Sequence, residues 1–205
     1  MTVNYTVRAN VVDIRWDKPK PRDNLLVDSN VWYWHAYPNA RYAAQPPKSY
    51  QITYYPTYII KAAAGANLFY NGLSLSEVGH LIEKVEHFIF DPSGLLRNKE
   101  FRHNFPVERN NVVKQIRRTW AKVERIAAPI EAVINQPAIG TALTRLATTL
   151  VDTYDLFLLE AATNAGITQI LTDDGDFATV AGIELFTANL NVIDAARTQR
   201  KLINR

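Results

Sequence analysis

Short apolar runs alternate along this chain with longer segments of helical periodicity. The run at 25–27 is wholly apolar and ends in polar residues, which is typical of a buried strand. The same pattern predicts further strands at 73–75, 131–134, 168–171 and 182–186. Strands that alternate with helices favour an α/β fold. We therefore expect a three-layer α/β/α sandwich with a mainly parallel central sheet.

Apolar residues recur at steps of three and four between these strands, which predicts helices. The expected helices are 32–37, 54–69, 76–90, 107–127, 138–149 and 155–165. The 107–127 segment is amphipathic, with a cationic face opposite its apolar one. That cationic face consists of Lys114, Arg117, Arg118, Lys122 and Arg125. The 155–165 segment is apolar nearly all round, so we expect it to be buried.

The pattern divides the chain into three parts. Residues 1–24 form an N-terminal extension that ends in a polar linker containing prolines. Residues 25–190 form the main domain, with a polar and helical insertion at about 91–128. Residues 191–205 form a basic C-terminal tail, expected to be helical or frayed.

Composition excludes several classes of site. The 205 residues include no Cys, so disulfides, thiol chemistry and thiolate metal sites are excluded. Neither of the glycine-rich phosphate loops, GxGxxG and GxxxxGK[ST], occurs. No apolar run approaches the roughly 18 residues that span a bilayer, and the first residues lack a signal-peptide pattern. We therefore expect a cytoplasmic protein without a membrane partner. Its net charge of +3 is only mildly basic.

Acidic residues stand where predicted strands end and predicted helices begin. Asp28 directly follows the first strand of the main domain, and Asp174 and Asp176 follow the strand at 168–171. The carboxyl ends of parallel strands share one edge of a sheet, where sites in such folds lie. Asp155 begins the apolar helix. We expect these carboxylates to converge.

A fifth acid, Glu77, stands in the first turn of the 76–90 helix. Converging carboxylates repel one another and need cations at neutral pH. All-oxygen ligands suit Mg²⁺ or Mn²⁺. Such ions assist the hydrolysis of phosphodiesters. The cationic helix face then offers contacts for nucleic-acid phosphates, although such a face is also common on solvent-exposed helices.

The residues at these positions resemble a known family. Leu25-Leu-Val-Asp-Ser-Asn30 resembles the opening strand and first acid of PIN domains. The stretches at 155–166 and 170–177, the latter reading Ile-Leu-Thr-Asp-Asp-Gly-Asp-Phe, resemble their closing half, and 182–186 resembles their last strand. The resemblance covers about 25–90 and 130–190. It implies a metal-dependent nuclease, and the commonest bacterial members are ribonuclease toxins of toxin–antitoxin pairs.

The resemblance also implies roles for single residues. The implied metal ligands are Asp28, Asp155, Asp174 and Asp176, and Glu77 joins them as a catalytic residue. Asn30 and Thr172 match polar positions that orient the acids. The implied cofactor is Mg²⁺ or Mn²⁺ and the implied substrate is RNA. The implied partners are an antitoxin protein and a second copy of the chain.

Each acid also has a purely structural interpretation. Asp28 and Asp155 are good helix caps, and Asp174-Gly175 is a common turn pair. Ser74-x-x-Glu77 matches a capping box, which would tie the glutamate to backbone N–H groups.

The aromatic run at 32–34, Trp-Tyr-Trp, has two interpretations. Core or partner-interface packing is the preferred one, and stacking on nucleic-acid bases is the alternative.

Two other functions compete with the nuclease. A PIN fold with a degraded site would act as a non-catalytic RNA-binding or scaffold protein, which the retained acids disfavour. An aspartate-based phosphatase needs Asp-x-Asp after its first strand, and here the third residue is Asn30. We therefore expect an endoribonuclease.

Overall fold

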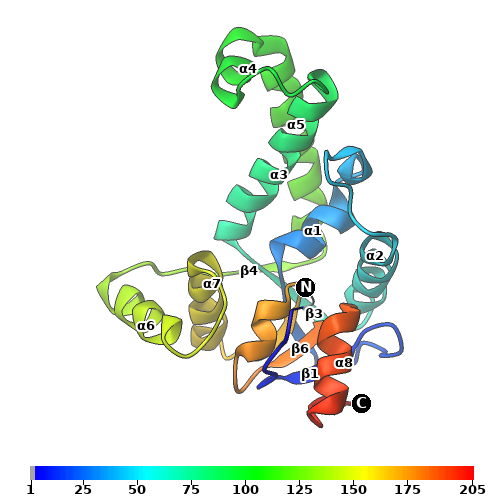
Figure 1. Ribbon diagram of the computed structural model, residues 1–205, viewed down its shortest axis with the longest axis vertical. Helices are drawn as coiled ribbons and strands as arrows, with labels where there is room; N and C mark the ends of the chain where they lie inside the picture. The colour runs from blue at the N-terminus through cyan, green and yellow to red at the C-terminus, as the bar shows by residue number, and fades with distance from the viewer. Residues whose placement is uncertain (1–2) are drawn as a thin grey trace.

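The computed structural model describes residues 3–205 and is built on a seven-stranded, all-parallel sheet (Figure 1). The strand order is β4-β3-β2-β5-β6-β1-β7. The strands are β1 (Asn10–Asp13), β2 (Asn24–Val27), β3 (Asn67–Asn71), β4 (Ala128–Ile130), β5 (Gln169–Leu171), β6 (Glu184–Thr187) and β7 (Leu202–Ile203). Because helices flank the sheet, the predicted three-layer α/β/α architecture is confirmed.

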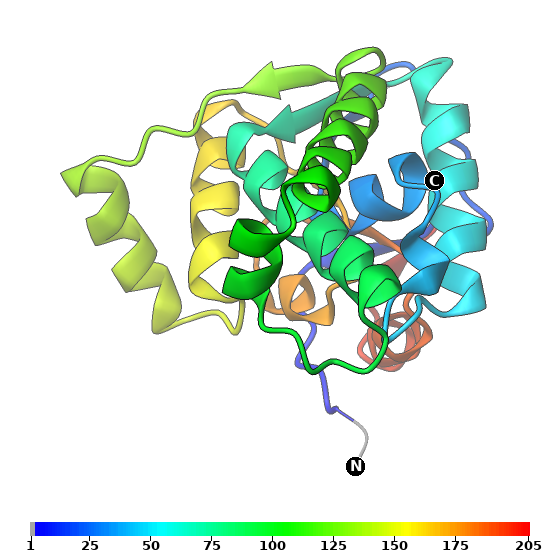
Figure 2. The same cartoon turned by 90° about the horizontal axis from the view of Figure 1, so that it is seen from above.

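The helices occupy the two faces of the sheet. They are α1 (Ser29–Ala36), α2 (Ser49–Ala63), α3 (Gly72–Phe90), α4 (Asn98–Asn104), α5 (Pro106–Glu124), α6 (Gln136–Leu146), α7 (Thr153–Asn164) and α8 (Leu190–Thr198). Short 3-10 helices lie at Ala40–Tyr42 and Gly175–Thr179. Figure 2 shows α6 and α7 on one side of the molecule and α2 on the other.

Side-chain alternation along the strands separates two hydrophobic cores. Leu26 and Ile170 face a core made with α6, α7 and α8. Leu25 and Leu171, one position away in each strand, face a core made with α1, α2, α3 and α5. Because neighbouring strand residues point to opposite faces, these short apolar runs serve both cores. This is why the run at 25–27 is continuously apolar.

Two of the predicted strands were wrong. Residues 73–75 belong to α3, because Asn71 ends β3 and its side chain caps the helix, accepting from Leu73 N at 2.8 Å. The strand that precedes α3 is β3, in a segment where the periodicity predicted a helix. Residues 131–134 lie in the connection to α6, and the strand there is β4. Pro129 is tolerated in β4 because this strand lies at the sheet edge.

The ends of the chain take part in the sheet. Residues 10–13 of the N-terminal extension form β1, which lies between β6 and β7. The C-terminal tail, predicted as a helix or frayed end, forms α8 and then β7. Two strands of the sheet therefore come from segments outside the main domain predicted from the sequence.

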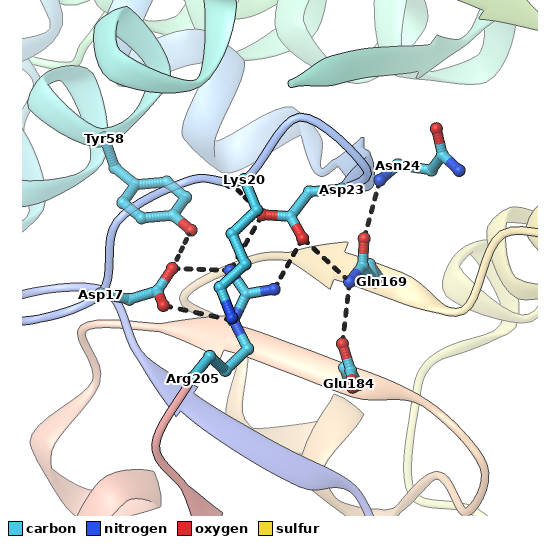
Figure 3. Close-up of polar contacts among 8 residues, drawn as sticks. All are labelled: Asp17, Lys20, Asp23, Asn24, Tyr58, Gln169, Glu184 and Arg205. Atoms are coloured by element: carbon cyan, nitrogen blue, oxygen red, sulfur yellow. Dashed lines mark hydrogen bonds and ion pairs between the residues drawn. The ribbon is translucent and has the colours of Figure 1, made fainter. Parts of the chain in front are cut away.

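Arg205, which lies after β7, binds the linker before β2 (Figure 3). Its guanidinium donates to Asp17 at 2.8 Å and to Asp23 at 2.6 Å, and lies 4.5 Å from the Phe186 ring centroid. Tyr58 OH donates to the same Asp17 carboxylate at 2.5 Å. Both carboxylates are almost fully buried, so this cluster holds charge inside the fold.

The insertion projects away from the sheet as α4 and α5, next to α3 (Figure 1). The predicted helix at 107–127 is confirmed as α5. The segment at 95–106 contains α4, which tertiary contacts hold in place. Arg102 pairs with the largely buried Glu83 of α3 at 2.5 Å, and Phe101 is buried. Within residues 3–205, no helix is long and apolar enough to cross a bilayer.

Candidate functional site

Asp28 occupies the carboxyl end of β2 and is only 4% exposed. Its Oδ1 accepts from Ser29 N at 2.6 Å. Its Oδ2 accepts from Asn30 Nδ2 and Thr172 Oγ1, both at 2.6 Å. Two of these bonds come from the first turn of α1 and one comes from Thr172, directly after β5. Asp28 is thus both a helix cap and the centre of a polar cluster.

Thr172 links the ends of β2 and β5. Besides donating to Asp28, its hydroxyl oxygen accepts from Asp174 N at 2.9 Å. Asp174 Oδ1 in turn accepts from Asp176 N at 2.9 Å, which starts the 3-10 helix. Hydrogen bonds therefore bring the side chains of Asp28, Asn30 and Thr172 together, with the backbone of Asp174 beside them.

Asp155 reaches the same edge from α7. The capping role falls to Asp152, whose Oδ1 accepts from Tyr154 N and Asp155 N at 2.8 and 2.9 Å. The interpretation of Asp155 as a helix cap is therefore wrong. Asp155 lies in the first helical turn, and it is only 7% exposed.

Burial and the charges of neighbouring acids raise the pKa of Asp28, Asp155, Asp174 and Asp176. For Asp155, burial raises the pKa and the charges of Asp28, Asp152, Asp174 and Glu77 raise it further. For Asp28, burial also raises the pKa, and the charges of Glu77 and Asp174 add to it, while bonds from Thr172 and Ser29 oppose the shift. The acids therefore lie within electrostatic reach of one another.

The pKa values of Asp174 and Asp176 are also raised. Burial raises the pKa of Asp174, and the charge of Asp152 adds to it. Burial raises the pKa of Asp176 as well, and the charges of Asp174 and Asp152 raise it further. Proton uptake or cation binding relieves such repulsion.

Glu77 joins the group from α3, where it is half-buried. The capping box was the wrong interpretation, because Asn71 caps α3 and Ser74 lies inside the helix. The charge of Glu77 raises the pKa of Asp28 and of Asp155, so Glu77 lies within electrostatic reach of both carboxylates.

Several buried polar atoms at this edge have no hydrogen-bond partner among the described residues. They are Ser29 Oγ, Asn30 Oδ1, Asn71 Nδ2, Ser74 Oγ and Tyr154 OH. They come from the ends of β2 and β3 and from the start of α7. Native proteins rarely leave such atoms unsatisfied, and a bound water or ion commonly completes their bonding.

The donor set at this edge suits a hard cation, because it consists of carboxylate, amide and hydroxyl oxygens. Across residues 3–205, however, no three acidic or histidine side chains form a group that could hold an ion together. Mg²⁺ commonly keeps several waters and uses one or two carboxylates plus substrate phosphate oxygens. The residues fit that manner of binding.

Three neighbours of this edge escaped the sequence analysis. Asp152 and Tyr154 flank Asp155, and Asp152-x-x-Asp155 is a capping pattern that the sequence does contain. Tyr5 covers the turn from the far N-terminus. A Cβ built on Gly175 would lie 2.3 Å from Tyr5 Cζ. No local sequence pattern predicts the contact between Tyr5 and Gly175, because the two residues are far apart in the chain.

The cationic residues predicted to bind RNA form a separate group on α5. Lys114, Arg117, Arg118 and Arg125 are exposed. Lys122 instead donates to Ala36 O at 2.7 Å and ties α5 to the end of α1. In the described part of the chain, none of the five shares a hydrogen bond or ion pair with the acids.

Comparisons with known proteins leave the family open. No family model matches the chain. No curated protein matches it. A crystal structure of PAE2754 from Pyrobaculum aerophilum is similar, at 14% identity over 90% of this chain and 96% of that chain, with a TM-score of 0.44. A likeness at that level carries no functional conclusion.

Proposed function

We propose that this chain is a PIN-like endoribonuclease that hydrolyses RNA phosphodiester bonds with Mg²⁺ or Mn²⁺. One observation carries the proposal. A buried carboxylate, Asp28, accepts hydrogen bonds from the first turn of α1 and from Thr172 after β5, while the charges of Glu77 and Asp174 raise its pKa. Such a cluster is unfavourable at neutral pH unless it binds protons or cations.

Each residue has a distinct part in this proposal. One or two of the carboxylates of Asp28, Asp155 and Asp174 would hold the cation together with waters and phosphate oxygens, with Asp176 and Glu77 at the margin. Asn30 and Thr172 fix the Asp28 carboxylate through bonds of 2.6 Å. When bound, the metal supplies a water of lowered pKa and positive charge near the leaving oxygen. The exposed cations of α5 would contact RNA phosphates.

The biological setting is a finer proposal. The motif resemblance to PIN domains suggests a toxin of a toxin–antitoxin pair, with a cytoplasmic location, an antitoxin partner and a homodimer. A small antitoxin-like chain encoded directly upstream, and its co-purification with this protein, would test that setting.

A non-catalytic, RNA-binding or scaffold role is the second candidate. The observation that favours it is the lack, among the described residues, of three acids that could hold one ion together. An aspartate-based phosphatase is less well supported, because Asn30 stands where its second acid belongs and donates to Asp28.

RNA cleavage separates these candidates. A pool of single-stranded and structured RNA is incubated with Mg²⁺, Mn²⁺ or EDTA and with wild type, Asp28→Asn or Asp174→Asn. Asp194→Asn is the matched control, since Asp194 is 66% exposed on α8 and pairs only with Arg197 at 2.6 Å. We expect metal-dependent cleavage by wild type and control, and at least a hundredfold loss in both site variants, in the range found for single catalytic groups.

The other outcomes decide against the nuclease. No cleavage by folded wild-type protein under any metal would favour the scaffold role. Cleavage that survives both site substitutions would mean that the site is misplaced or that a contaminant cuts the RNA.

A further inference from the structure

A cavity of about 620 Å³ lies beside the acidic edge, between α1, α3 and the loop that leads into α2. Its volume falls within the range of small-molecule sites in proteins. Tyr33 and Trp34 of α1 form part of its wall, and the loop contributes Pro46 and Pro47. The cavity is therefore large enough for a nucleobase with its sugar.

Two residues connect this cavity with the acids. Asn30 lines it and donates through Nδ2 to Asp28 Oδ2 at 2.6 Å. Gln51 lines it as well, and its Nε2 donates to Asp173 Oδ2 at 2.6 Å. Asp173 directly precedes Asp174 in the turn after β5. A group bound in the cavity thus lies one side chain away from the cluster around Asp28.

The chemistry of the wall suits a nucleotide. Trp34 is half-buried, and its ring packs on Tyr55 with centroids 5.4 Å apart, which holds the indole in place. Lys48 stands on the loop and Lys84 on α3, and both are exposed. Of the described residues that line the cavity, these two are cationic and none is acidic. An aromatic face stacks on a base, and ammonium groups pair with phosphates.

We propose that this cavity binds one unpaired base of single-stranded RNA beside the acidic edge, with Trp34 against the base and Lys48 and Lys84 on the flanking phosphates. This inference rests on the proposed function, since it names a substrate subsite of the same centre. A base in a duplex is stacked and paired, so it cannot enter such a cavity. Stacking also tolerates any base, so little sequence preference is expected at this position.

Binding is measured in EDTA, so that it does not depend on cleavage. The probe is a fluorescein-labelled single-stranded RNA of twelve nucleotides, and the readout is anisotropy at several salt concentrations. The test variants are Trp34→Ala, Trp34→Phe and the double variant Lys48→Ala/Lys84→Ala. The matched control is Lys61→Ala/Lys99→Ala, whose lysines are exposed outside the cavity. Lys61 lies roughly 20 Å from Lys48 along α2.

We expect Trp34→Ala to weaken binding about tenfold and Trp34→Phe to retain most of it, since one stacked base contributes in that range. The double lysine variant should flatten the slope of log K against log salt by about 1.4, because each phosphate contact on a single strand contributes about 0.7. The control should keep the wild-type slope. A blunt-ended duplex of the same sequence should bind more weakly, and none of the cavity variants should change its affinity.

The results that would contradict this base-binding inference differ from those that would contradict the proposed nuclease. If the lysine variant, folded by circular dichroism, binds single strands with wild-type affinity and slope, the cavity is not the subsite, even where metal-dependent cleavage is found. If the cavity variants lose binding while wild type cuts no RNA with any metal, the subsite stands and the nuclease proposal falls. Equal losses on single-stranded and duplex RNA would overturn the base-binding inference, since they would indicate phosphate contacts alone.

Discussion

Asp28 combines two opposing influences at a single carboxylate. Three donors at 2.6 Å favour its charged form, while burial and the charges of Glu77 and Asp174 disfavour it. The second group wins, so the pKa is raised. A cation near this carboxylate would reverse that balance, because positive charge favours the ionised form of every acid in the group.

Asp155 allows this balance to be measured through stability. Because its pKa is raised, the folded protein holds this proton at pH values where the unfolded chain, with a pKa of about 3.9, has released it. The contribution of Asp155 to stability is therefore highest at low pH and is lost as pH rises through its folded pKa. Asp155→Asn removes the ionisation, so it should stabilise the protein at pH 7.5 by at least about 1.4 kcal/mol, the equivalent of one pKa unit.

Urea unfolding in EDTA at pH 4 and pH 7.5 measures this difference. The increase in the free energy of unfolding caused by Asp155→Asn should be small at pH 4 and large at pH 7.5. The exposed control Asp194→Asn should show no such increase at either pH. Adding Mg²⁺ at pH 7.5 should stabilise wild type and leave Asp155→Asn nearly unchanged. A variant that is less stable than wild type at pH 7.5 in EDTA would contradict the raised pKa.

Thr172 is the second residue whose role can be tested alone. Its hydroxyl donates to Asp28 and accepts from Asp174 N, and the residue is fully buried. Thr172→Val removes both bonds, which leaves Asp174 N without a partner and Asp28 Oδ2 with its bond from Asn30 alone, so it should cost about 2 kcal/mol of stability. Thr172→Ser keeps the hydroxyl and should recover most of the loss in urea unfolding. If both variants behave alike, the methyl group and not the hydroxyl matters.

At the scale of elements, the turn after β5 depends on the N-terminal segment that crosses it. Gly175 is buried, and a side chain there would meet the Tyr5 ring at 2.3 Å. Gly175→Ala should therefore displace Tyr5 and destabilise the protein by about 1–3 kcal/mol, the usual cost of overpacking. In a Tyr5→Ala background the same substitution should cost much less.

A double-mutant cycle in thermal unfolding measures this coupling. We expect an interaction energy of about 1 kcal/mol or more between the two positions, as found for residues in contact. Additive losses would mean that Tyr5 does not pack on this turn in solution.

The sequence predicted those elements whose hydrophobic period and length match the way in which the element is buried in the fold. The run at 25–27 and the amphipathic segment at 107–127 were found because one is buried on both faces and the other on a single face. β3 was missed because its five residues mix apolar and polar side chains directly before a helix. β7 was missed because only two residues pair with β1.

The site was partly predictable for a related reason. Acids that follow strand ends can be placed by topology alone, which is how Asp28 and Asp174 were found. Asp152 has a local signal in its capping pattern, whereas Tyr5 depends on how the N-terminal segment approaches that edge, which no local pattern encodes. The orphaned Ser29 and Asn71 atoms could be recognised only when packing was known.

For the whole molecule, segments near both ends of the chain complete the sheet. β1 inserts between β6 and β7, and both contacts depend on tertiary packing. Arg205 lies two residues after β7 and binds the two linker acids, Asp17 and Asp23, that precede β2. The strand that carries Asp28 at its end is therefore tied, through Asp23, to the last strand of the sheet.

Replacing Arg205 by Gln should thus destabilise the entire fold. Its ion pairs are almost wholly buried, with side chains 9% and 4% exposed, and breaking a buried pair typically costs about 3–5 kcal/mol. Burial alone would raise the pKa of Asp23, but bonds from Arg205, Lys20 N and Gln169 outweigh it and hold the pKa below its usual value. The stabilisation from Asp23 is therefore present above the unfolded pKa of about 3.9 and is lost as pH falls through the folded pKa.

Urea unfolding at pH 7 and pH 3 therefore tests the ion pairs that link Arg205, after the last strand, to Asp17 and Asp23 of the linker. Arg205→Gln should lose about 3 kcal/mol at pH 7. The difference from wild type should be smaller at pH 3, since protonated Asp23 no longer gains from the guanidinium. Arg197→Gln, in a pair that is 60% and 66% exposed, should lose less than about 1 kcal/mol at either pH. Equal small losses in both variants would show that the sheet holds its edge without Arg205, and that β1 and β7 are anchored by packing alone.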